Sequence, residues 1–300
     1  MKNLFVVAIF LITSFKVFAQ FDYQIFQEFS NPIIKQQNSK LISVTELQLA
    51  DRNNWLKISY QEFNPDGLPN KLIQYDKANI EIRQMHFYYS DEGEISRIET
   101  YEGKKHNGST EFKLNASGQV VLYTEYIYSS LDSKKLLVGK TFIEYYPDKT
   151  IKKTINIETD ADTSKVNYYS TSGELVKSIW KIQGLRTTKI EYLWNKDKTE
   201  MKENHYENDT SIYSTVIHRY RNKKEVERID PSISMKPFYW KYDSNGRVIE
   251  TNQDYYDVIY YSYDNEGRLV NKIMNILFTD SSEKDLPKKV SYKYEYKLRN

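Results

Sequence analysis

The sequence predicts an all-β protein, an elongated and twisted antiparallel β-meander built from about nine hairpin repeats of roughly 25 residues. Three observations predict this class: a recurring turn motif, period-two alternation beside the turns, and an unusual composition. The 300 residues include 27 tyrosines and 13 phenylalanines, yet only 39% of the chain is hydrophobic. Aromatic residues favour strands, and an amphipathic ring such as Tyr suits a sheet whose faces are neither dry nor fully wet.

The first residues, "MKNLFVVAIFLITSFKVFAQ", have the features of a secretory signal peptide. A lysine precedes an apolar run, and small Ala19 precedes Gln20, so we predict a signal peptide over residues 1–19 with cleavage between these two. A transmembrane anchor is the alternative, but it requires about 20 consecutive apolar residues, and Lys16 interrupts this run. No cysteine surrounds the cleavage point, which excludes a lipid anchor. We therefore expect an exported protein of the periplasm, the extracellular space or the cell surface.

The charge balance of the chain bears on its partners. The whole chain has 43 basic and 41 acidic side chains, and loss of the signal removes Lys2 and Lys16 but no acid. A neutral chain has no electrostatic footprint for nucleic acid, so we expect no nucleic-acid partner. With no cysteine, no disulfide stabilises the fold. Stability must come from burial and from the hydrogen-bond ladder. We expect a capping segment over residues 20–54 and one repeat domain over residues 55–300.

The repeat is an apolar residue followed by a polar turn and a second apolar residue, and its nine occurrences span residues 63–269. In order they are "FNPDGLP", "YSDEGEI", "LNASGQV", "YPDKTI", "YSTSGEL", "WNKDKTEM", "YRNKKEV", "YDSNGRV" and "YDNEGRL". Asp, Asn and Ser accept hydrogen bonds from the backbone two residues on, and Gly supplies the positive φ that a hairpin turn requires. The flanking apolar residues are then expected to lie opposite one another on paired strands.

The turn glycines are therefore predicted to be structural. They are Gly93, Gly118, Gly173, Gly246 and Gly267. None opens a helix, as a phosphate-binding loop would require. Where glycine is missing, near Lys198 and Lys224, Asn195 and Asn222 keep the turn polar, and we expect a different turn type there.

The segments beside the turns alternate as strands do. Tyr292, Tyr294 and Tyr296 share one face, while Lys293 and Glu295 lie on the other. This period of two, bounded by turns, predicts antiparallel strands. Two strands in each repeat give roughly eighteen strands in total. Charged residues along the strands also protect free edges from pairing with other molecules.

The two most C-terminal units carry a family resemblance. "YDSNGRVIETN" (242–252) and "YDNEGRLVNKI" (263–273) resemble the YD repeats of Rhs-type proteins. The resemblance implies a secreted or surface-associated protein whose repeats build a long, spiralling antiparallel sheet. Because the chain stops at the strand-like "SYKYEYKLRN", the expectation is a short array without a C-terminal toxin domain.

A transmembrane β-barrel is the rival architecture with similar strand content. Its lipid-facing band requires continuous apolar positions about 25 Å tall. Here the candidate outward rows are rich in Tyr and interrupted by charge, as at Lys293 and Glu295. We therefore expect no membrane span once the signal is removed.

Residues with catalytic or metal-binding chemistry are few. No pair among His86, His106, His205 and His218 has i, i+4 spacing, and neither a metalloprotease motif nor a serine nucleophile elbow is present. We expect no catalytic residue, no metal and no cofactor. Two alternatives stay open. Asp160 and Asp162 could form a weak calcium site, and carboxylates such as Glu111 or Glu144 could form a hydrolase pair.

The aromatic excess suggests the remaining alternative. Rows of rings on an exposed sheet face can stack on sugars, and Trp180, Trp194 and Trp240 are the candidate ligand-binding residues. The simpler interpretation is that these rings fill the curled sheet. We therefore predict a non-enzymatic scaffold or binding protein of the cell envelope, with an envelope protein or a glycan as its partner. A carbohydrate-binding module is the alternative.

Overall fold

The computed structural model describes most of the chain after residue 39. The described residues are 40–51, 54–129, 134–159, 164–181, 187–207, 210–232, 237–254, 257–276 and 289–299. The expected signal peptide, its cleavage point at Ala19 and Gln20, most of the capping segment and the Asp160/Asp162 pair lie outside them.

The described residues are organised as antiparallel strands. In the first half of the chain these are β1 (Leu41–Asp51), β2 (Asn54–Phe63), β3 (Pro69–Tyr75), β4 (Glu81–Tyr89), β5 (Ile95–Glu102), β6 (Lys105–Leu114), β7 (Val120–Tyr128), β8 (Lys135–Tyr145), β9 (Ile151–Glu158) and β10 (Ser164–Tyr169). In the second half they are β11 (Leu175–Lys181), β12 (Thr188–Trp194), β13 (Glu200–Glu207), β14 (Ser211–Arg221), β15 (Lys224–Ile229), β16 (Phe238–Tyr242), β17 (Val248–Asp254), β18 (Asp257–Tyr263), β19 (Leu269–Ile276) and β20 (Lys289–Leu298). Within these residues no helix is long and apolar enough to cross a membrane.

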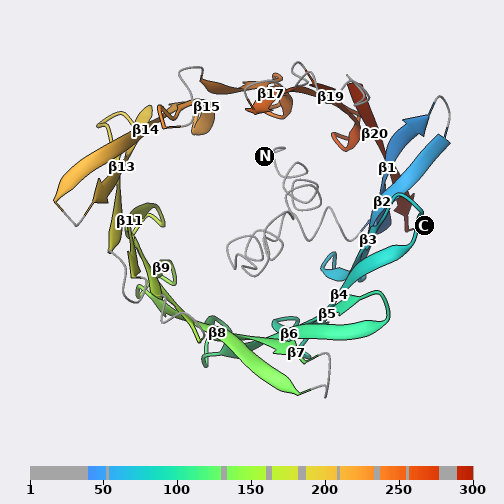
Figure 1. Ribbon diagram of the computed structural model, residues 1–300, viewed down its shortest axis with the longest axis horizontal. Helices are drawn as coiled ribbons and strands as arrows, with labels where there is room; N and C mark the ends of the chain where they lie inside the picture. Colours follow the sequence, from blue (N-terminus) through green and yellow to red (C-terminus); the bar gives the residue numbers. More distant parts are fainter. Residues whose placement is uncertain are drawn as a thin grey trace. The chain divides into compact units, whose positions relative to one another are not determined.

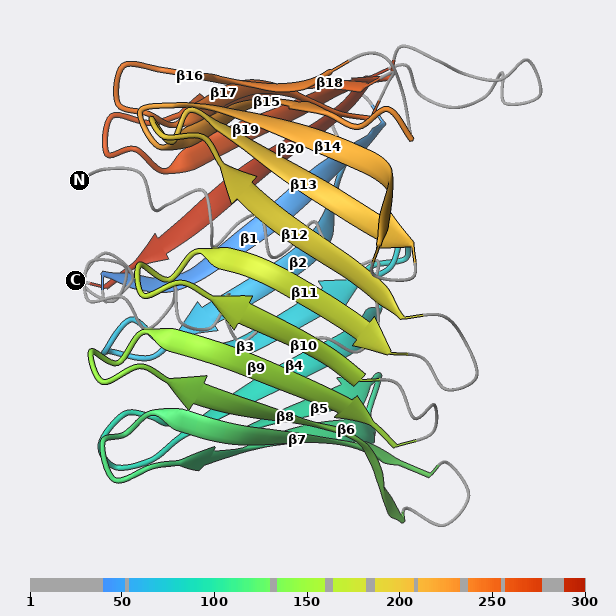
Figure 2. The same cartoon turned by 90° about the vertical axis from the view of Figure 1, so that its left-hand side faces the viewer.

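Two compact units contain these strands. The first unit holds the described residues up to 87, residues 102–104 and those from 238 onward, and the second holds residues 88–101 and 105–237. Inside each unit, strands adjacent in sequence pair antiparallel, as β8 to β13 do in Figure 2. The predicted all-β hairpin meander is therefore confirmed.

The hairpin turns use the chemistry that their sequences indicate. At the last one, the amide of Asp264 donates to the carbonyl of Arg268 at 2.9 Å, and the Gly267 amide donates back to Asp264 O at 3.0 Å. The Asp264 carboxylate accepts the amides of Glu266 and Arg268 at 3.0 and 2.8 Å. Gly267 has a φ of 86°, which L side chains rarely adopt. Tyr263 lies opposite Leu269, as the repeat predicts.

The arginine of the motif connects one hairpin to the next. Arg247 binds Asp243 through its side chain and lies over the ring of Tyr263, 4.7 Å from the centroid. The Tyr263 hydroxyl donates to the carbonyl of Val248 at 2.8 Å. The same set recurs one repeat later, with Arg268 over Tyr296 and the Tyr296 hydroxyl on the carbonyl of Leu269. Tyr, Asp, Arg and the aliphatic residue recur together because they form this contact.

The turns that lack glycine adopt more than one conformation. Lys149 takes a φ of 71° and keeps the hydrogen bonds of the glycine turns, and Asn79 does the same in a hairpin outside the nine repeats. Lys198 has a φ of 55° in a turn one residue longer. Asn222 and Lys223 both have positive φ in a two-residue turn, the mark of a type I′ hairpin. The turns at Lys198 and Lys223 therefore differ in type, as the missing glycines indicated.

Two opposite substitutions, at Lys149 and at Gly93, test how much a side chain at positive φ costs in these turns. Lys149→Gly should raise the free energy of unfolding by about 0.5–1 kcal/mol, because glycine relieves the left-handed backbone at a modest entropic cost. Gly93→Ala should lower it by about 1 kcal/mol, since a Cβ at Gly93 meets nothing within 4 Å and only the φ of 79° opposes it. Urea unfolding of both variants measures the two changes. A loss of stability in Lys149→Gly would contradict this account.

In both units the strands have a buried face and an exposed face. In β8, Gly139, Thr141 and Ile143 are buried, whereas Lys140, Phe142 and Glu144 are exposed. In the first unit the buried face carries the hydrophobic core, composed of Leu41, Val44, Phe63, Val248, Ile259, Tyr261, Leu269 and Tyr294. Trp240, Tyr242 and Tyr263 are among the partly buried rings packed against that core.

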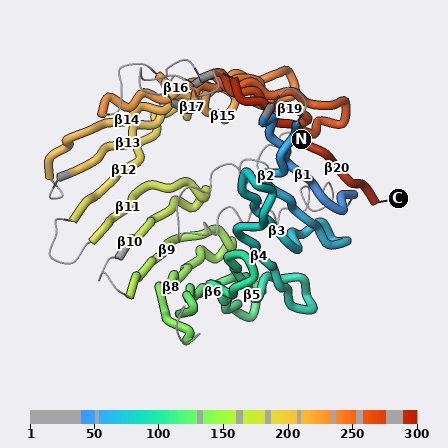
Figure 3. Tube along the Cα trace, turned by 45° about the vertical axis from the view of Figure 1, so that its right-hand side comes forward, coloured from blue at the N-terminus to red at the C-terminus, as the bar shows by residue number. Residues whose placement is uncertain are grey.

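The first and last of the described strands pair with each other. β1 and β20 run antiparallel with Val44 opposite Tyr296 and Glu46 opposite Tyr294, and they lie side by side in Figure 1 and Figure 3. The twenty described strands belong to one sheet, and the first of them pairs with the last. The predicted elongated, open-ended array is therefore wrong. Pairing the ends satisfies backbone groups that an open sheet would leave unpaired.

Buried polar side chains fasten this pairing. Glu46, on β1, is 1% exposed. It accepts hydrogen bonds from the Tyr294 hydroxyl at 2.9 Å, Lys272 Nζ at 3.3 Å and Ser59 Oγ at 3.3 Å. Burial lowers the pKa of Lys272, against the opposing effect of Glu46. The group, which we call the closure clasp, joins β1, β2, β19 and β20.

Loss of one charge of the clasp should destabilise the protein. Lys272→Met leaves the Glu46 carboxylate buried without its cation, which should cost roughly 3 kcal/mol in urea unfolding. Adding Glu46→Gln should recover part of that loss, because the uncompensated charge is gone. Lys293→Met, which breaks the more exposed pair with Glu295 at 2.8 Å, is the control and should cost less than about 1 kcal/mol. Equal effects of the two lysine variants would contradict a role for the clasp.

Candidate functional site

The tryptophans proposed as ligand-binding residues do not form one stacking surface. In the second unit, Trp180 lies opposite Thr188 at the start of β12, and Trp194 lies at its end. Six residues of strand separate these positions, roughly 20 Å. Lys165 covers the Trp180 ring at 4.4 Å. In the first unit, Trp240 packs against the hydrophobic core. This geometry does not favour the carbohydrate-binding alternative.

The densest group of titratable side chains surrounds His218 on the buried face of the second unit. His218, on β14, is 8% exposed. Its Nδ1 lies 2.7 Å from Glu225 Oε1 on β15, and its Nε2 lies 3.2 Å from Glu203 Oε2 on β13. His205 Nε2 is 2.9 Å from the other oxygen of Glu203. Three strands therefore meet at one imidazole.

The two carboxylates fix the charge of this imidazole. Burial acts to lower the pKa of His218, but the hydrogen bonds with Glu203 and Glu225 outweigh it and raise the pKa to about 9. The hydrogen bond with His218 in turn holds the pKa of Glu203 below its usual value. Both ring nitrogens of His218 are engaged, so neither is available to take up or deliver a substrate proton. The group acts as a structural clamp.

The clamp makes stability depend on pH. The folded-state pKa of His218 is raised to about 9 from the ordinary 6.5, so its contribution is full below about pH 6.5 and disappears as pH rises through about 9. His218→Gln should cost roughly 3 kcal/mol at pH 7, and the difference from wild type should shrink by pH 10. Urea unfolding at both pH values measures this.

A neighbouring histidine supplies the control. His205→Gln leaves His218, Glu203 and Glu225 in place, so the loss of stability through pH 9 should persist in that variant. If wild type and His218→Gln showed the same pH dependence between pH 7 and pH 10, the clamp would not be charged as described.

One pair of carboxylates approaches across the buried face, and the sequence did not single it out. Glu125 on β7 and Glu158 on β9 both lie opposite Gly139 of β8, which puts no side chain between them. Burial and then repulsion from Glu158 raise the pKa of Glu125 to about 7. A β-bulge after Glu125 sets this register, which a single sequence does not reveal.

The carboxylates suggested as a hydrolase pair are separately engaged. Glu111 forms an ion pair with Lys135, and Glu144 lies 3.7 Å from Lys153. Neither faces the other. Over the described part of the chain, no group of three or more His, Cys, Asp or Glu side chains could hold a metal ion.

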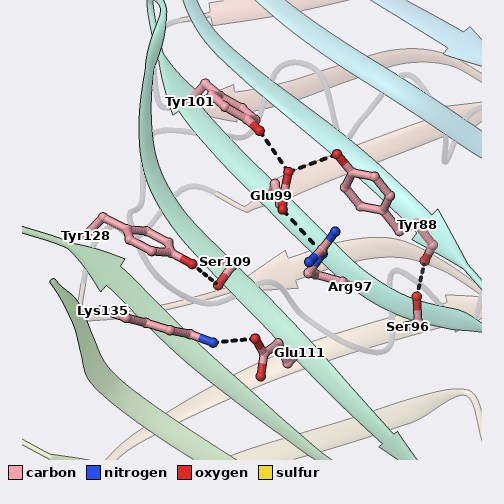
Figure 4. A network of polar contacts seen from close by, with 9 residues as sticks. All are labelled: Tyr88, Ser96, Arg97, Glu99, Tyr101, Ser109, Glu111, Tyr128 and Lys135. Carbon is pink, nitrogen blue, oxygen red and sulfur yellow. Dashed lines mark hydrogen bonds and ion pairs between the residues drawn. The ribbon is translucent and has the colours of Figure 1, made fainter. Parts of the chain in front are cut away.

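The exposed face of the second unit is different, because its polar side chains form ordered surface networks. In Figure 4, the Glu99 carboxylate accepts hydrogen bonds from the hydroxyls of Tyr88 and Tyr101, each at 2.8 Å. Arg97 Nε lies 3.3 Å from the other Glu99 oxygen, and its guanidinium covers the Tyr88 ring at 4.6 Å. The His106 ring packs against the Tyr101 ring at 4.8 Å.

The hydrogen bonds and charges of this network determine the protonation states of Glu99 and Tyr101. Partial burial disfavours ionised Glu99, but the bonds from Tyr101 and Tyr88 and the charge of Arg97 outweigh it and keep the pKa of Glu99 low. The hydrogen bond to Glu99 in turn raises the pKa of Tyr101 to about 12. Glu99 is therefore an anion and Tyr101 a hydrogen-bond donor at neutral pH.

The same pattern of tyrosine, cation and carboxylate recurs along this face. Lys135 lies 3.8 Å from the Tyr126 ring centroid and pairs with Glu111. Lys189 lies 3.8 Å from the Tyr206 ring centroid, and the Tyr206 hydroxyl donates to Glu191 at 2.8 Å. These cross-strand contacts fix large amphipathic rings in one orientation. The exposed face is the candidate functional surface.

Comparison with known proteins yields no family assignment. No family model and no curated protein matches the chain. Among solved structures, a porin-like protein from Bacteroides uniformis is similar over 86% of this chain and 97% of its own, at 8% identity and a TM-score of 0.36. A porin-like protein from Bacteroides vulgatus covers 86% of this chain and 98% of its own, at 13% identity and a TM-score of 0.28. TcdB2-TccC3 covers 77% of this chain and 15% of its own, at 12% identity and a TM-score of 0.27.

These scores assign neither a family nor an activity. The expected membership of the YD-repeat family is wrong on two counts. No family model finds such repeats in the chain, and the pairing of β1 with β20 joins the ends that an elongated repeat array keeps apart.

Proposed function

We propose that this is an exported, non-enzymatic scaffold protein of the cell envelope that binds a partner through the exposed face of its second unit. The observation that carries the proposal is the ordered array of tyrosines and paired charges on that face. Tyrosine supplies a large, rigid and amphipathic contact area at low conformational-entropy cost, which suits protein recognition. Export is proposed from the signal-peptide features of residues 1–19.

The proposed environment of the exposed face is water. Lys140 is an exposed residue in the middle of β8, and Lys153 on β9 and Lys189 on β12 lie on the same face. A lysine on the lipid face of a membrane strand costs about 2–4 kcal/mol at the bilayer midplane. The opposite, buried face carries the ionic His218 clamp. Neither face therefore offers the continuous apolar band that lipid requires.

The absence of enzymatic chemistry is proposed from how the reactive groups are used. His218 is clamped on both nitrogens, and Glu111 and Glu144 are paired with lysines. The Glu125 and Glu158 pair lies on the buried face, away from the exposed face. A role in binding explains the ordered tyrosines and paired charges of the exposed face better than a role in catalysis does.

Fractionation combined with site-specific crosslinking tests the proposal. Cells producing the full chain with its own leader should release the mature protein, residues 20–300, into the periplasm or medium without detergent. A photo-crosslinking amino acid at Glu144 should trap one discrete adduct of higher mass. Glu144 is suitable because it is exposed beside the tyrosine-rich surface.

Position 241 provides the comparison. Lys241 is also exposed and paired with a glutamate, Glu250 at 2.7 Å, but it belongs to the first unit. The crosslinker there should give no adduct of the same mass. Recovery of the protein only after detergent extraction, or no adduct from any exposed position of the second unit, would overturn the proposal.

A further inference from the structure

A row of apolar side chains crosses the exposed face of the second unit. Directly opposed residues on paired strands point to the same side of a sheet, so the register places the row on one face. Its members, from β7 to β11, are Leu122, Phe142, Ile155, Val166 and Ile179. Phe142 is 38% exposed and the others are half-buried. With strands about 4.8 Å apart, the row is roughly 19 Å long.

This row differs from the next row on the same strands and from a comparable row of the first unit. The next row along the same strands is polar and charged, running from Glu144 through Lys153 and Tyr168 to Lys177. In the first unit a comparable row runs from Lys241 through Glu250 and Tyr260 to Ile273, mixing charge with apolar groups. Contiguous apolar side chains rimmed by polar residues mark interaction sites.

Lysines surround the row, and the charge there is unbalanced. Lys113 lies opposite Leu122, at one end of the apolar side chains. Lys140 and Lys181 belong to the neighbouring row of residues on one side, and Lys177 belongs to the neighbouring row on the other side. Lys113, Lys140 and Lys181 form no ion pair with another described residue, whereas Lys177 lies opposite Glu191 on β12. The carboxylates beside the row do have cations, since Glu144 lies near Lys153, and Glu191 lies 3.2 Å from Lys189.

We infer that this row, which we call the apolar row, binds an acidic segment of a partner protein. The segment would have apolar side chains flanked by aspartates or glutamates. Apolar contacts along the row supply affinity, and the unpaired lysines select for negative charge. The inference rests on the proposed binding function and names the chemistry of the partner.

Other occupants fit less well. A second copy of this chain would oppose lysines to lysines if the same row met itself, which is unfavourable. A bilayer would need a broader apolar surface, because rows on one face of a sheet are only about 7 Å apart and both neighbouring rows carry lysine. A narrow protein segment matches a row that is one side chain wide.

Peptide selection tests the inference directly. A displayed library of random peptides of about 12 residues, long enough to span the row as a helix or a strand, is panned against the mature protein. The selected peptides should be enriched in Asp and Glu around regularly spaced apolar residues. Their affinity should fall at least tenfold in Phe142→Asp and should weaken as salt is raised, since the flanking charges are exposed.

The matched control is Leu193→Asp. Leu193 is 51% exposed on the same face, outside the apolar row, so the change adds the same charge without touching the row. Affinity should change less than twofold there, and both variants should melt within a few degrees of wild type. Selection without acidic enrichment, or equal loss in both variants, would overturn the inference.

Anionic vesicles of phosphatidylglycerol separate a lipid ligand from a protein segment. Vesicle binding that is lost in Phe142→Asp, with no peptide selected, would overturn the inference in favour of a membrane surface. The outcome is distinguishable from failure of the scaffold proposal. Fractionation and crosslinking report on export and on any partner, whereas panning reports only on the chemistry that the apolar row accepts.

Discussion

The pairing of β1 with β20 is the constraint on which the sheet depends. It brings together residues as far apart in sequence as Glu46 and Tyr294, which are 248 positions apart. Such a contact carries an entropic cost, because it closes a long loop of the chain. A charged clasp suits this position. A buried carboxylate tolerates few arrangements, so it favours one register of the two strands over its neighbours.

Local contacts also stabilise each hairpin and connect it to the next. Asp243, Arg247 and Tyr263 form a continuous chain of contacts from one turn to the next strand. The tyrosine hydroxyl satisfies a backbone carbonyl of the preceding hairpin, and the arginine covers its ring. The repeat therefore specifies how consecutive hairpins associate, in addition to where the chain turns. Long-range order can then accumulate stepwise along the chain.

The sequence predicts the turns and strands of this fold, but it does not predict the pairing of strands that are far apart in the chain. Turn residues such as Gly267 and the alternation of Tyr292, Tyr294 and Tyr296 predict hairpins and strands, because both depend on neighbours in the chain. Closure depends on Glu46, which looks like an ordinary strand residue until β19 and β20 lie beside it. The strand count also exceeds the expected eighteen, because the nine motif hairpins account for β2 to β19 while β1 and β20 lie outside them.

The candidate surface is built from residues that the sequence does not single out. Tryptophan is conspicuous in a sequence, but Trp180 and Trp194 are separated by the length of β12. The apolar row has no such signal, because each strand contributes one ordinary aliphatic or aromatic residue. Its existence depends on four successive registers, one of them next to a bulge in the β7 and β8 pairing. A one-residue slip in any of them would turn part of the row to the buried face, so the same hydrogen-bond ladder that holds the sheet together also assembles the surface proposed for binding.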